Sequence, residues 1–180
     1  MASYPSPGAV RELYSAEIIA RRVGELGQAI ARDYAGRSPV LVSILKGSFV
    51  FAADLTRAIA LPIRVEFLGV RSYDAGTETT GAVQITQDLT HSVEGEEVLV
   101  VEDIVDTGLT VSYIKNLLRA RGATSVRVVA LLDKPVRRRV EVVADYVGFT
   151  VGDAFVVGYG LDVGERYRNL PCLAELLEKP

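Results

Sequence analysis

The sequence predicts an α/β domain built on a central, mainly parallel, twisted sheet flanked by helices. Three observations predict it. Short, nearly continuous apolar runs alternate along the chain with segments of helical periodicity. Several of these runs lack the polar alternation of a strand with one wet face, so helices are expected on both faces of the sheet. The 180 residues are 49% hydrophobic and 24% charged, which suits a single globular domain.

The first seventy or so residues predict two helices and two strands. Ser15 is a good N-cap for a helix that ends near Tyr34, with apolar residues at helical spacing between them. Residues 39–44 form one of the apolar runs and predict a strand covered on both faces. Helical periodicity follows over residues 48–61, and the alternating residues 63–70 predict a second strand.

The second half of the chain continues the alternation. Residues 97–101 predict a buried strand, residues 109–121 a helix, and residues 125–132 a further strand. Short strands are expected near residues 146–149 and 154–157, followed by irregular chain.

Two segments have no apolar stripe. Residues 1–9 are rich in Pro and Gly and predict a loose leader, so one domain is expected over residues 10–180. Small polar residues between about 71 and 90 predict a mobile excursion, with a hairpin arm returning near Gln84 and Ile85.

Charge and composition exclude several classes of function. The net charge of −3 gives the protein no overall electrostatic attraction to nucleic acid or to an anionic membrane. The basic run at residues 137–139 predicts a solvated face rather than a nucleic-acid site. A single cysteine, Cys172, allows no internal disulfide and suggests a packed thiol, and a single histidine, His91, predicts a surface residue without a partner. With no apolar run long enough to cross a membrane and no secretory signal pattern, a cytoplasmic address is expected.

The segment from residue 98 to residue 110 carries most of the chemistry. A buried strand leads to two adjacent carboxylates, Glu102 and Asp103, then to Asp106 and to a helix entry at residues 107–110. Ligands of open α/β sheets bind beyond the carboxyl ends of strands, and a helix start offers backbone N–H groups to a phosphate. The three carboxylates then suit a divalent cation or sugar hydroxyls. The alternative is a turn in which Asp106 only caps the helix; neither a Walker A loop nor a dinucleotide fingerprint is present.

Residues 102–110, Glu-Asp-Ile-Val-Asp-Thr-Gly-Leu-Thr, resemble the phosphoribosyl-pyrophosphate (PRPP) motif of type I phosphoribosyltransferases. Four further segments are similar to those of the hypoxanthine-guanine phosphoribosyltransferase family, in its order and spacing, within a resemblance that spans about residues 10–177. They are Leu45-Lys46-Gly47, Ser72-Tyr73, Leu131-Leu132-Asp133-Lys134-Pro135, and Phe155 to Asp162 followed by Arg166-Tyr167-Arg168.

The resemblance implies a fold and a reaction. The sheet would carry a small hood, formed mainly by the C-terminal part, and a mobile lid at about residues 71–90. The reaction would move the 5-phosphoribosyl group of PRPP to N9 of hypoxanthine or guanine, giving IMP or GMP and pyrophosphate, with Mg²⁺ as cofactor. Relatives commonly form homodimers or homotetramers, so the same is expected of this chain.

The resemblance also assigns roles to residues of the PRPP motif. Asp106 would be the general base near purine N7. Glu102 and Asp103 would bind ribose hydroxyls and Mg²⁺, and Asp162 would reach a second Mg²⁺. Residues 106–110 would clasp the 5-phosphate of PRPP, and Leu109 would contribute only its backbone amide. The remaining PRPP-binding members of the motif are Ile104, Thr107, Gly108 and Thr110.

Pyrophosphate and the purine would be held by the other segments. Lys46, Gly47 and Arg168 would bind pyrophosphate, and the peptide that enters Lys46 can be cis in relatives. Ser72 and Tyr73 would open the lid, which excludes water from the reaction.

By the same resemblance, Lys134 would donate to the 6-oxo group of the purine, which disfavours the amino group of adenine. Phe155 would stack on the base, and the backbone at Val156 and Asp162 would read its edge. After Asp162, Val163-Gly164 stands where relatives more often carry an aromatic residue.

Two alternatives stay open at this stage. One is a phosphoribosyltransferase that prefers xanthine, since the Val163-Gly164 departure leaves the order of preference among 6-oxopurines undecided. The other is a regulator of the same fold that senses PRPP or nucleotides. A regulator would need a basic face or an added nucleic-acid-binding module, and it would have no need of Lys134 and Phe155.

Overall fold

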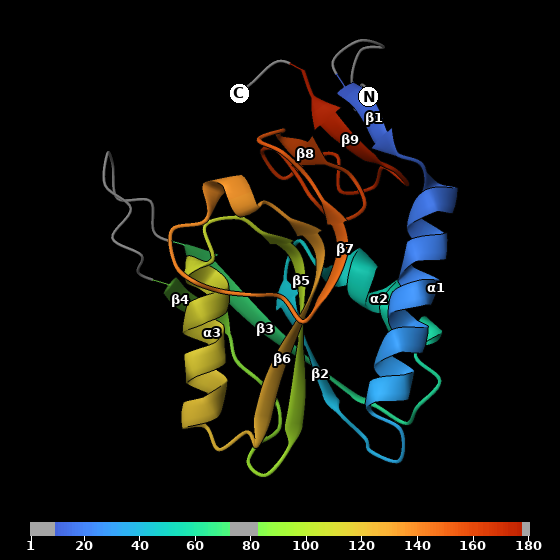
Figure 1. The fold of residues 1–180 in the computed structure, drawn as a ribbon. Helices are drawn as coiled ribbons and strands as arrows, with labels where there is room; N and C mark the ends of the chain where they lie inside the picture. Colours follow the sequence, from blue (N-terminus) through green and yellow to red (C-terminus); the bar gives the residue numbers. More distant parts are fainter. Residues whose placement is uncertain (1–9, 73–82, 178–180) are drawn as a thin grey trace.

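The computed structural model describes residues 10–72 and 83–177, and its centre is a six-stranded sheet in the order β4-β3-β2-β5-β6-β7 (Figure 1). Strands β3, β2, β5, β6 and β7 are parallel, and only β4 is antiparallel to its neighbour. The strands are β2 (Val40–Leu45), β3 (Arg64–Ser72), β4 (Val83–Gln87), β5 (Glu97–Val105), β6 (Ser125–Asp133) and β7 (Tyr146–Thr150). The predicted α/β architecture is confirmed.

Helices cover both faces of this sheet. Helices α1 (Ala16–Asp33) and α2 (Phe49–Ala58) lie on one face, and α3 (Leu109–Ala120) lies on the other (Figure 1). Leu99 packs into the core on the α1 and α2 side, whereas its neighbour Val100 packs into the core beneath α3. Alternate residues of a strand point to opposite faces, so both must be apolar when both faces are covered. The continuous apolar runs of the sequence follow from this arrangement.

A smaller antiparallel sheet, in the order β1-β9-β8, forms the hood above the carboxyl ends of the large sheet (Figure 1). It consists of β1 (Val10–Tyr14), β8 (Val156–Val157) and β9 (Leu173–Leu176). The expectation of irregular chain after residue 157 is therefore wrong at β9, and the N-terminal β1 was not predicted. Tyr14, at the end of β1, stacks on Phe149 of β7 with 4.0 Å between ring centroids, which joins the hood to the sheet.

The central strand β5 is longer than predicted. The apolar run ends at Val101, yet the backbone stays paired with β6 as far as Val105 opposite Asp133. Glu102 and Asp103 are therefore held within the sheet rather than on a turn. Glu102 is buried and Asp103 is partly buried there, at the carboxyl end of the sheet, where open α/β sheets bind their ligands.

Of the remaining predictions about the fold, some concern residues that the structure describes and others concern residues that it does not describe. The hairpin arm is confirmed, because β4 pairs with the end of β3. The leader (residues 1–9), the central part of the expected lid (73–82) and the last three residues lie outside the described residues. Across the described parts of the chain, no helix is both long enough and apolar enough to cross a membrane.

Candidate active site

The predicted general base and the predicted purine-reading lysine lie side by side at the carboxyl edge of the sheet. Asp106 follows the last residue of β5 and Lys134 follows the last residue of β6. The amide of Lys134 donates to the carbonyl of Val105 over 3.0 Å, which links the two strand ends directly. Lys134 is buried, with 4% of its surface exposed. Asp106 and Lys134, which are distant in the sequence, are therefore neighbours in the fold.

A sharp turn leads from Asp106 into α3 and shapes the predicted phosphate loop. Gly108 is the N-cap residue, at a φ of 84°, which a residue with a β-carbon adopts only with strain. A β-carbon at residue 108 would also lie 3.1 Å from atoms of Arg138 and Val140. Gly108 has no side chain with which to cap the helix, and the Leu109 amide donates to Thr107 Oγ1 over 3.4 Å, so Thr107 rather than Asp106 takes the capping role in this turn. The first amides of α3 have no preceding helical turn to donate to, as an anion-binding loop requires.

The adjacent acids Glu102 and Asp103 carry strongly perturbed carboxyl groups. Burial, and after it the neighbouring Asp103 charge, raises the pKa of Glu102 well above its usual range, and its Oε2 atom has no hydrogen-bond partner. Burial also raises the pKa of Asp103 to about 6, although the Ile104 amide donates to Asp103 Oδ1 over 2.8 Å. A buried carboxylate oxygen without a donor suits a cation or a sugar hydroxyl.

Metal ligation from protein groups alone is not apparent at this edge. Among residues 10–72 and 83–177, no three His, Cys, Asp or Glu side chains are gathered closely enough to hold an ion. Mg²⁺ is commonly bound by one or two carboxylates together with substrate phosphates and water. Glu102 and Asp103 would fit that mode if a bound substrate phosphate supplied further oxygens.

Three loops meet around Gly47. A β-carbon at residue 47 would fall 1.5 Å from Asp103 Oδ2, and one at Gly160 would fall 2.3 Å from the carbonyl oxygen of Gly47. Only glycine permits both approaches. The Leu45–Lys46 peptide before this loop is cis, as the resemblance implied. The predicted pyrophosphate loop, the acidic strand end and the C-terminal loop are therefore in direct contact.

Arg168 and Lys46, both predicted to bind pyrophosphate, face the same acidic side chain. Glu165 Oε2 lies 3.1 Å from Lys46 Nζ and 3.2 Å from Arg168 Nη2. Arg168 also pairs with Asp162 over 2.8 Å and donates to the carbonyl of Gly160 over 2.8 Å. Glu165 was missed by the sequence analysis. Its only signal is its place in the loop between the matched residues Asp162 and Arg168.

The purine-side residues come from the hood and the loop after β6. Phe155 is half-buried and its carbonyl accepts the Leu176 amide over 2.8 Å, while Val156 is buried in β8. Of the lid residues, Ser72 ends β3 and Tyr73 lies outside the described residues. Ile104 and Thr107 to Thr110 are at the strand end and helix entry, as predicted.

The expectation that residues 137–139 form a solvated charge run holds for Arg137 and Arg139, which are exposed, but is wrong for Arg138. Arg137 Nε lies 3.2 Å from Asp106 Oδ1, an oxygen that no hydrogen bond reaches. The Arg138 side chain is largely buried and donates to main-chain carbonyls of the strand end. Composition cannot reveal this burial, because the acceptors come from β5 and the preceding turn. The position of the run, directly after Lys134, was the available signal.

His91 has a partner that the sequence did not indicate. Its Nδ1 lies 2.7 Å from Glu66 Oε1, and the Thr90 amide donates to Glu66 Oε2 over 3.0 Å. The imidazole is nevertheless exposed, as expected. Burial opposes ionisation of Glu66, but these two hydrogen bonds outweigh it and lower the pKa of that carboxyl.

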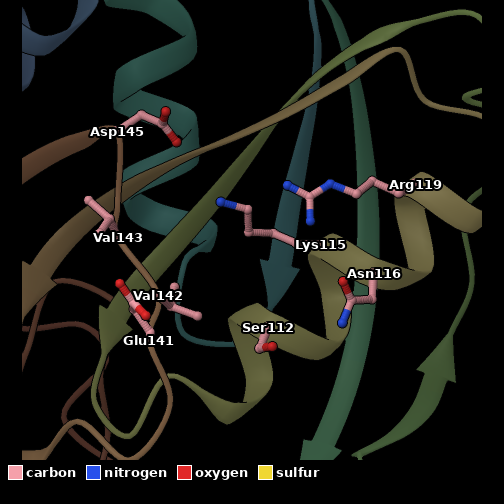
Figure 2. Close-up of a pocket in the computed structure, with 8 residues that line it drawn as sticks. All are labelled: Ser112, Lys115, Asn116, Arg119, Glu141, Val142, Val143 and Asp145. Atoms are coloured by element: carbon pink, nitrogen blue, oxygen red, sulfur yellow. The ribbon is translucent and has the colours of Figure 1, made fainter.

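A separate groove of about 320 Å³ lies between the solvent-facing side of α3 and the chain leading to β7 (Figure 2). Basic side chains from α3 and acidic side chains from the facing segment both line it. This mixture of charge gives it no clear preference for a polyanion such as PRPP. Its lining residues are Ser112, Lys115, Asn116, Arg119, Glu141, Val142, Val143 and Asp145.

This chain is similar to known proteins over most of its length. The Phosphoribosyl transferase domain family matches residues 9–163. The hypoxanthine-guanine phosphoribosyltransferase of Bacillus subtilis is 48% identical over 164 residues, which cover 91% of each chain. The bifunctional protein TilS/HprT of Listeria monocytogenes is also 48% identical over 164 residues, but the match spans only 25% of its length.

Two solved structures extend the comparison. A hypoxanthine phosphoribosyltransferase from Staphylococcus aureus superposes with a TM-score of 0.89 at 46% identity, covering 92% of this chain and 90% of that one. The hypoxanthine phosphoribosyl transferase of Trypanosoma cruzi gives a TM-score of 0.90 at 43% identity, covering 97% and 94%.

The fold and the site thus define a phosphoribosyl transferase domain that occupies most of the chain. Its relatives of similar length share both the sequence and the architecture. The chain belongs to the hypoxanthine-guanine phosphoribosyltransferase family.

Proposed function

We propose that this chain is a purine-salvage enzyme that transfers the 5-phosphoribosyl group of PRPP to N9 of hypoxanthine or guanine. The products are IMP or GMP and pyrophosphate. The observation that carries the proposal is the junction of Asp106 and Lys134, where the Lys134 amide donates to the Val105 carbonyl. A group that takes a proton from the purine and a group that reads its 6-oxo oxygen must lie this close, because both act on one small base.

Asp106 acts as the general base. An oxocarbenium-like ribose and a leaving pyrophosphate develop in the transition state, so the incoming purine must lose its proton as the new bond forms. Arg137 Nε lies 3.2 Å from the Asp106 Oδ1 atom, and no hydrogen bond occupies that oxygen. A purine N7–H can therefore donate to it once Arg137 yields.

The remaining residues hold PRPP. The amides and hydroxyls of residues 107–110 hold the 5-phosphate at the start of α3. Glu102 and Asp103 hold the ribose hydroxyls and Mg²⁺, with Asp162 near the same loop. Mg²⁺, when bound, neutralises charge on the leaving pyrophosphate. Lys46, Gly47 and Arg168 lie where three loops meet and hold that pyrophosphate.

Purine recognition and closure complete the site. Lys134 selects a 6-oxo group, Phe155 stacks on the base, and the backbone at Val156 and Asp162 contacts its edge. The segment beginning at Ser72 and Tyr73 closes over PRPP to exclude water. We also propose that the protein acts in the cytoplasm as a homodimer or homotetramer, without nucleic-acid or membrane partners.

The test is a nucleotide-formation assay with PRPP, Mg²⁺ and one purine at a time. Hypoxanthine and guanine should be converted and adenine should not. D106N should bind PRPP normally but turn over about 10²–10⁴-fold more slowly. Near-normal turnover of D106N contradicts the role of Asp106. Faster use of xanthine than of hypoxanthine or guanine makes the xanthine alternative correct, and PRPP binding without conversion of any purine favours the regulator.

A further inference from the structure

Arg138 connects the ends of the two strands that carry the site. Its Nη1 atom donates to the carbonyl of Val105 over 3.1 Å and to that of Asp106 over 2.8 Å. Its Nη2 atom donates to the Asp133 carboxylate, with which it forms an ion pair. Only 17% of the Arg138 side chain is exposed. One guanidinium therefore holds three acceptors from the ends of β5 and β6.

The two carbonyls have a special relation to the proposed base. The Val105 carbonyl belongs to the peptide plane before the Asp106 α-carbon, and the Asp106 carbonyl belongs to the plane after it. Fixing both planes fixes both backbone dihedrals of Asp106, and so the direction in which its carboxylate leaves the main chain. Arg138 acts on the orientation of Asp106 without touching its carboxylate.

The third acceptor ties the same guanidinium to the purine-reading side. Asp133 immediately precedes Lys134, and the Lys134 amide shares the Val105 carbonyl with Arg138. A planar guanidinium presents several N–H donors in a fixed fork, which a lysine ammonium does not. The spacing between the proposed base and the proposed purine-reading lysine thus depends on an arginine.

We propose that Arg138 is a positioning residue for phosphoribosyl transfer. It holds the peptide planes on either side of Asp106 and aims that carboxylate at the purine held by Lys134. This inference rests on the proposed function. Arg138 itself contacts no substrate and acts through Asp106.

Arg22 provides a matched control. Its guanidinium also donates to two consecutive carbonyls, those of Val147 over 2.7 Å and Gly148 over 2.8 Å, and it pairs with Glu25 over 2.7 Å. These contacts join α1 to β7, away from the strand ends that carry Asp106 and Lys134. Loss of either arginine should lower the melting temperature, but only loss of Arg138 should change catalysis.

The experiment compares R138A, R138K and R22A with the unsubstituted enzyme. R138A should lower kcat with hypoxanthine by about 10–100-fold, because a misplacement of a reacting group by about 1 Å can cost about 10²-fold in rate. The KM for PRPP should change much less than kcat, because Arg138 packs against Gly108 of the phosphate loop but donates no hydrogen bond to residues 107–110. R138K should recover part of the lost kcat, and R22A should keep the kcat of the unsubstituted enzyme.

A double-mutant cycle tests whether Arg138 acts through Asp106. In a D106N background the R138A substitution should cost far less than in the unsubstituted enzyme, because the base it aims is absent. Hydrogen exchange at the Lys134 amide, which requires no turnover, should rise in R138A and not in R22A. A kcat of R138A equal to that of R22A, or an equal cost in both backgrounds, overturns the positioning role. If the unsubstituted enzyme itself converts no purine, the proposed function fails, and the positioning role fails with it.

Discussion

The backbone of Gly47 packs so closely against the carboxylate of Asp103 that a β-carbon at residue 47 would fall 1.5 Å from Asp103 Oδ2. The pyrophosphate loop and the acidic strand end are thus built as one unit. A residue proposed to bind the leaving group controls the position of a residue proposed to bind the ribose and Mg²⁺.

Gly47→Ala should therefore impair PRPP use without unfolding the protein. The new methyl group must displace the Asp103 carboxylate, and a shift of about 1 Å in such a site can cost about 10²-fold in rate. We expect a higher KM for PRPP and a kcat/KM at least about tenfold lower. Steady-state kinetics with PRPP varied, and circular dichroism for the fold, measure these effects.

Gly24→Ala is the control for that substitution. Gly24 lies within α1, and a β-carbon there meets no atom within 4 Å. Alanine in a helix interior should stabilise the protein by about 0.5–1 kcal/mol and leave the kinetics unchanged. An unchanged KM for PRPP in Gly47→Ala would show that the Asp103 carboxylate has no role in binding PRPP.

Asp103→Asn should stabilise the protein and inactivate it. Burial raises the pKa of Asp103 to about 6, above the 3.8 expected when the chain is unfolded. The ionised carboxylate is therefore disfavoured in the folded state at pH 7, by about 1–3 kcal/mol. Asparagine removes that penalty, together with a ligand for Mg²⁺ and ribose.

The stability gained by Asp103→Asn should depend on pH in a definite direction. A carboxyl whose pKa is raised by folding destabilises the native state above the folded pKa, and the penalty disappears as pH falls to the unfolded pKa. The stability advantage of Asp103→Asn should thus be full above about pH 6 and vanish near pH 4. Urea unfolding at pH 7.5 and pH 4 measures it. An advantage of equal size at both pH values would contradict the burial of this charge.

Lys134→Ala should weaken purine use more than PRPP use. Removal of the buried ammonium leaves the 6-oxo oxygen without its donor, so the KM for hypoxanthine should rise by about 10–100-fold, the cost of a lost charged hydrogen bond. The preference over adenine should decrease at the same time. Kinetics with each substrate varied separately distinguish the two sites. An equal loss of affinity for PRPP and purine would count against this assignment.

Much of the fold could be predicted from sequence because its signals are local. The apolar runs predict β2 and β6, and the apolar stripe predicts α1, from residues that are close together in the sequence. The hood could not be predicted in the same way, since β1 pairs with β9 from the other end of the chain and each is marginal alone. The strands β1 and β9 form because they pair with each other, and no local sequence pattern indicates that pairing.

The candidate site shows the same difference between local and long-range signals. The positions of Asp106 and Lys134 at the ends of two strands could be predicted, because a contiguous motif surrounds each residue. Glu165 and the buried state of Arg138 could not, because their partners come from other elements. The His91–Glu66 contact was missed for the same reason. From the sequence alone a charged side chain is expected to be solvated, and only the fold shows which groups from other elements contact it.

Glu165 allows one further prediction about pyrophosphate. Its carboxylate bridges Lys46 and Arg168, at 3.1 Å and 3.2 Å, so it occupies the anion position between two proposed pyrophosphate ligands. The hydrogen bond from Lys46, followed by that from Arg168, lowers the pKa of Glu165 and keeps it charged. Incoming pyrophosphate must compete with this carboxylate.

Glu165→Gln should therefore tighten pyrophosphate binding. The effect should be about two- to fivefold, as befits an exposed ion pair, and it should shrink in high salt. Product inhibition by pyrophosphate, measured at two ionic strengths, gives the affinity. Glu25→Gln is the control, because Glu25 forms an exposed pair with Arg22 over 2.7 Å on α1 and should have no effect. Weaker pyrophosphate binding in Glu165→Gln would mean that Glu165 orients Lys46 and Arg168 for the anion instead of competing with it.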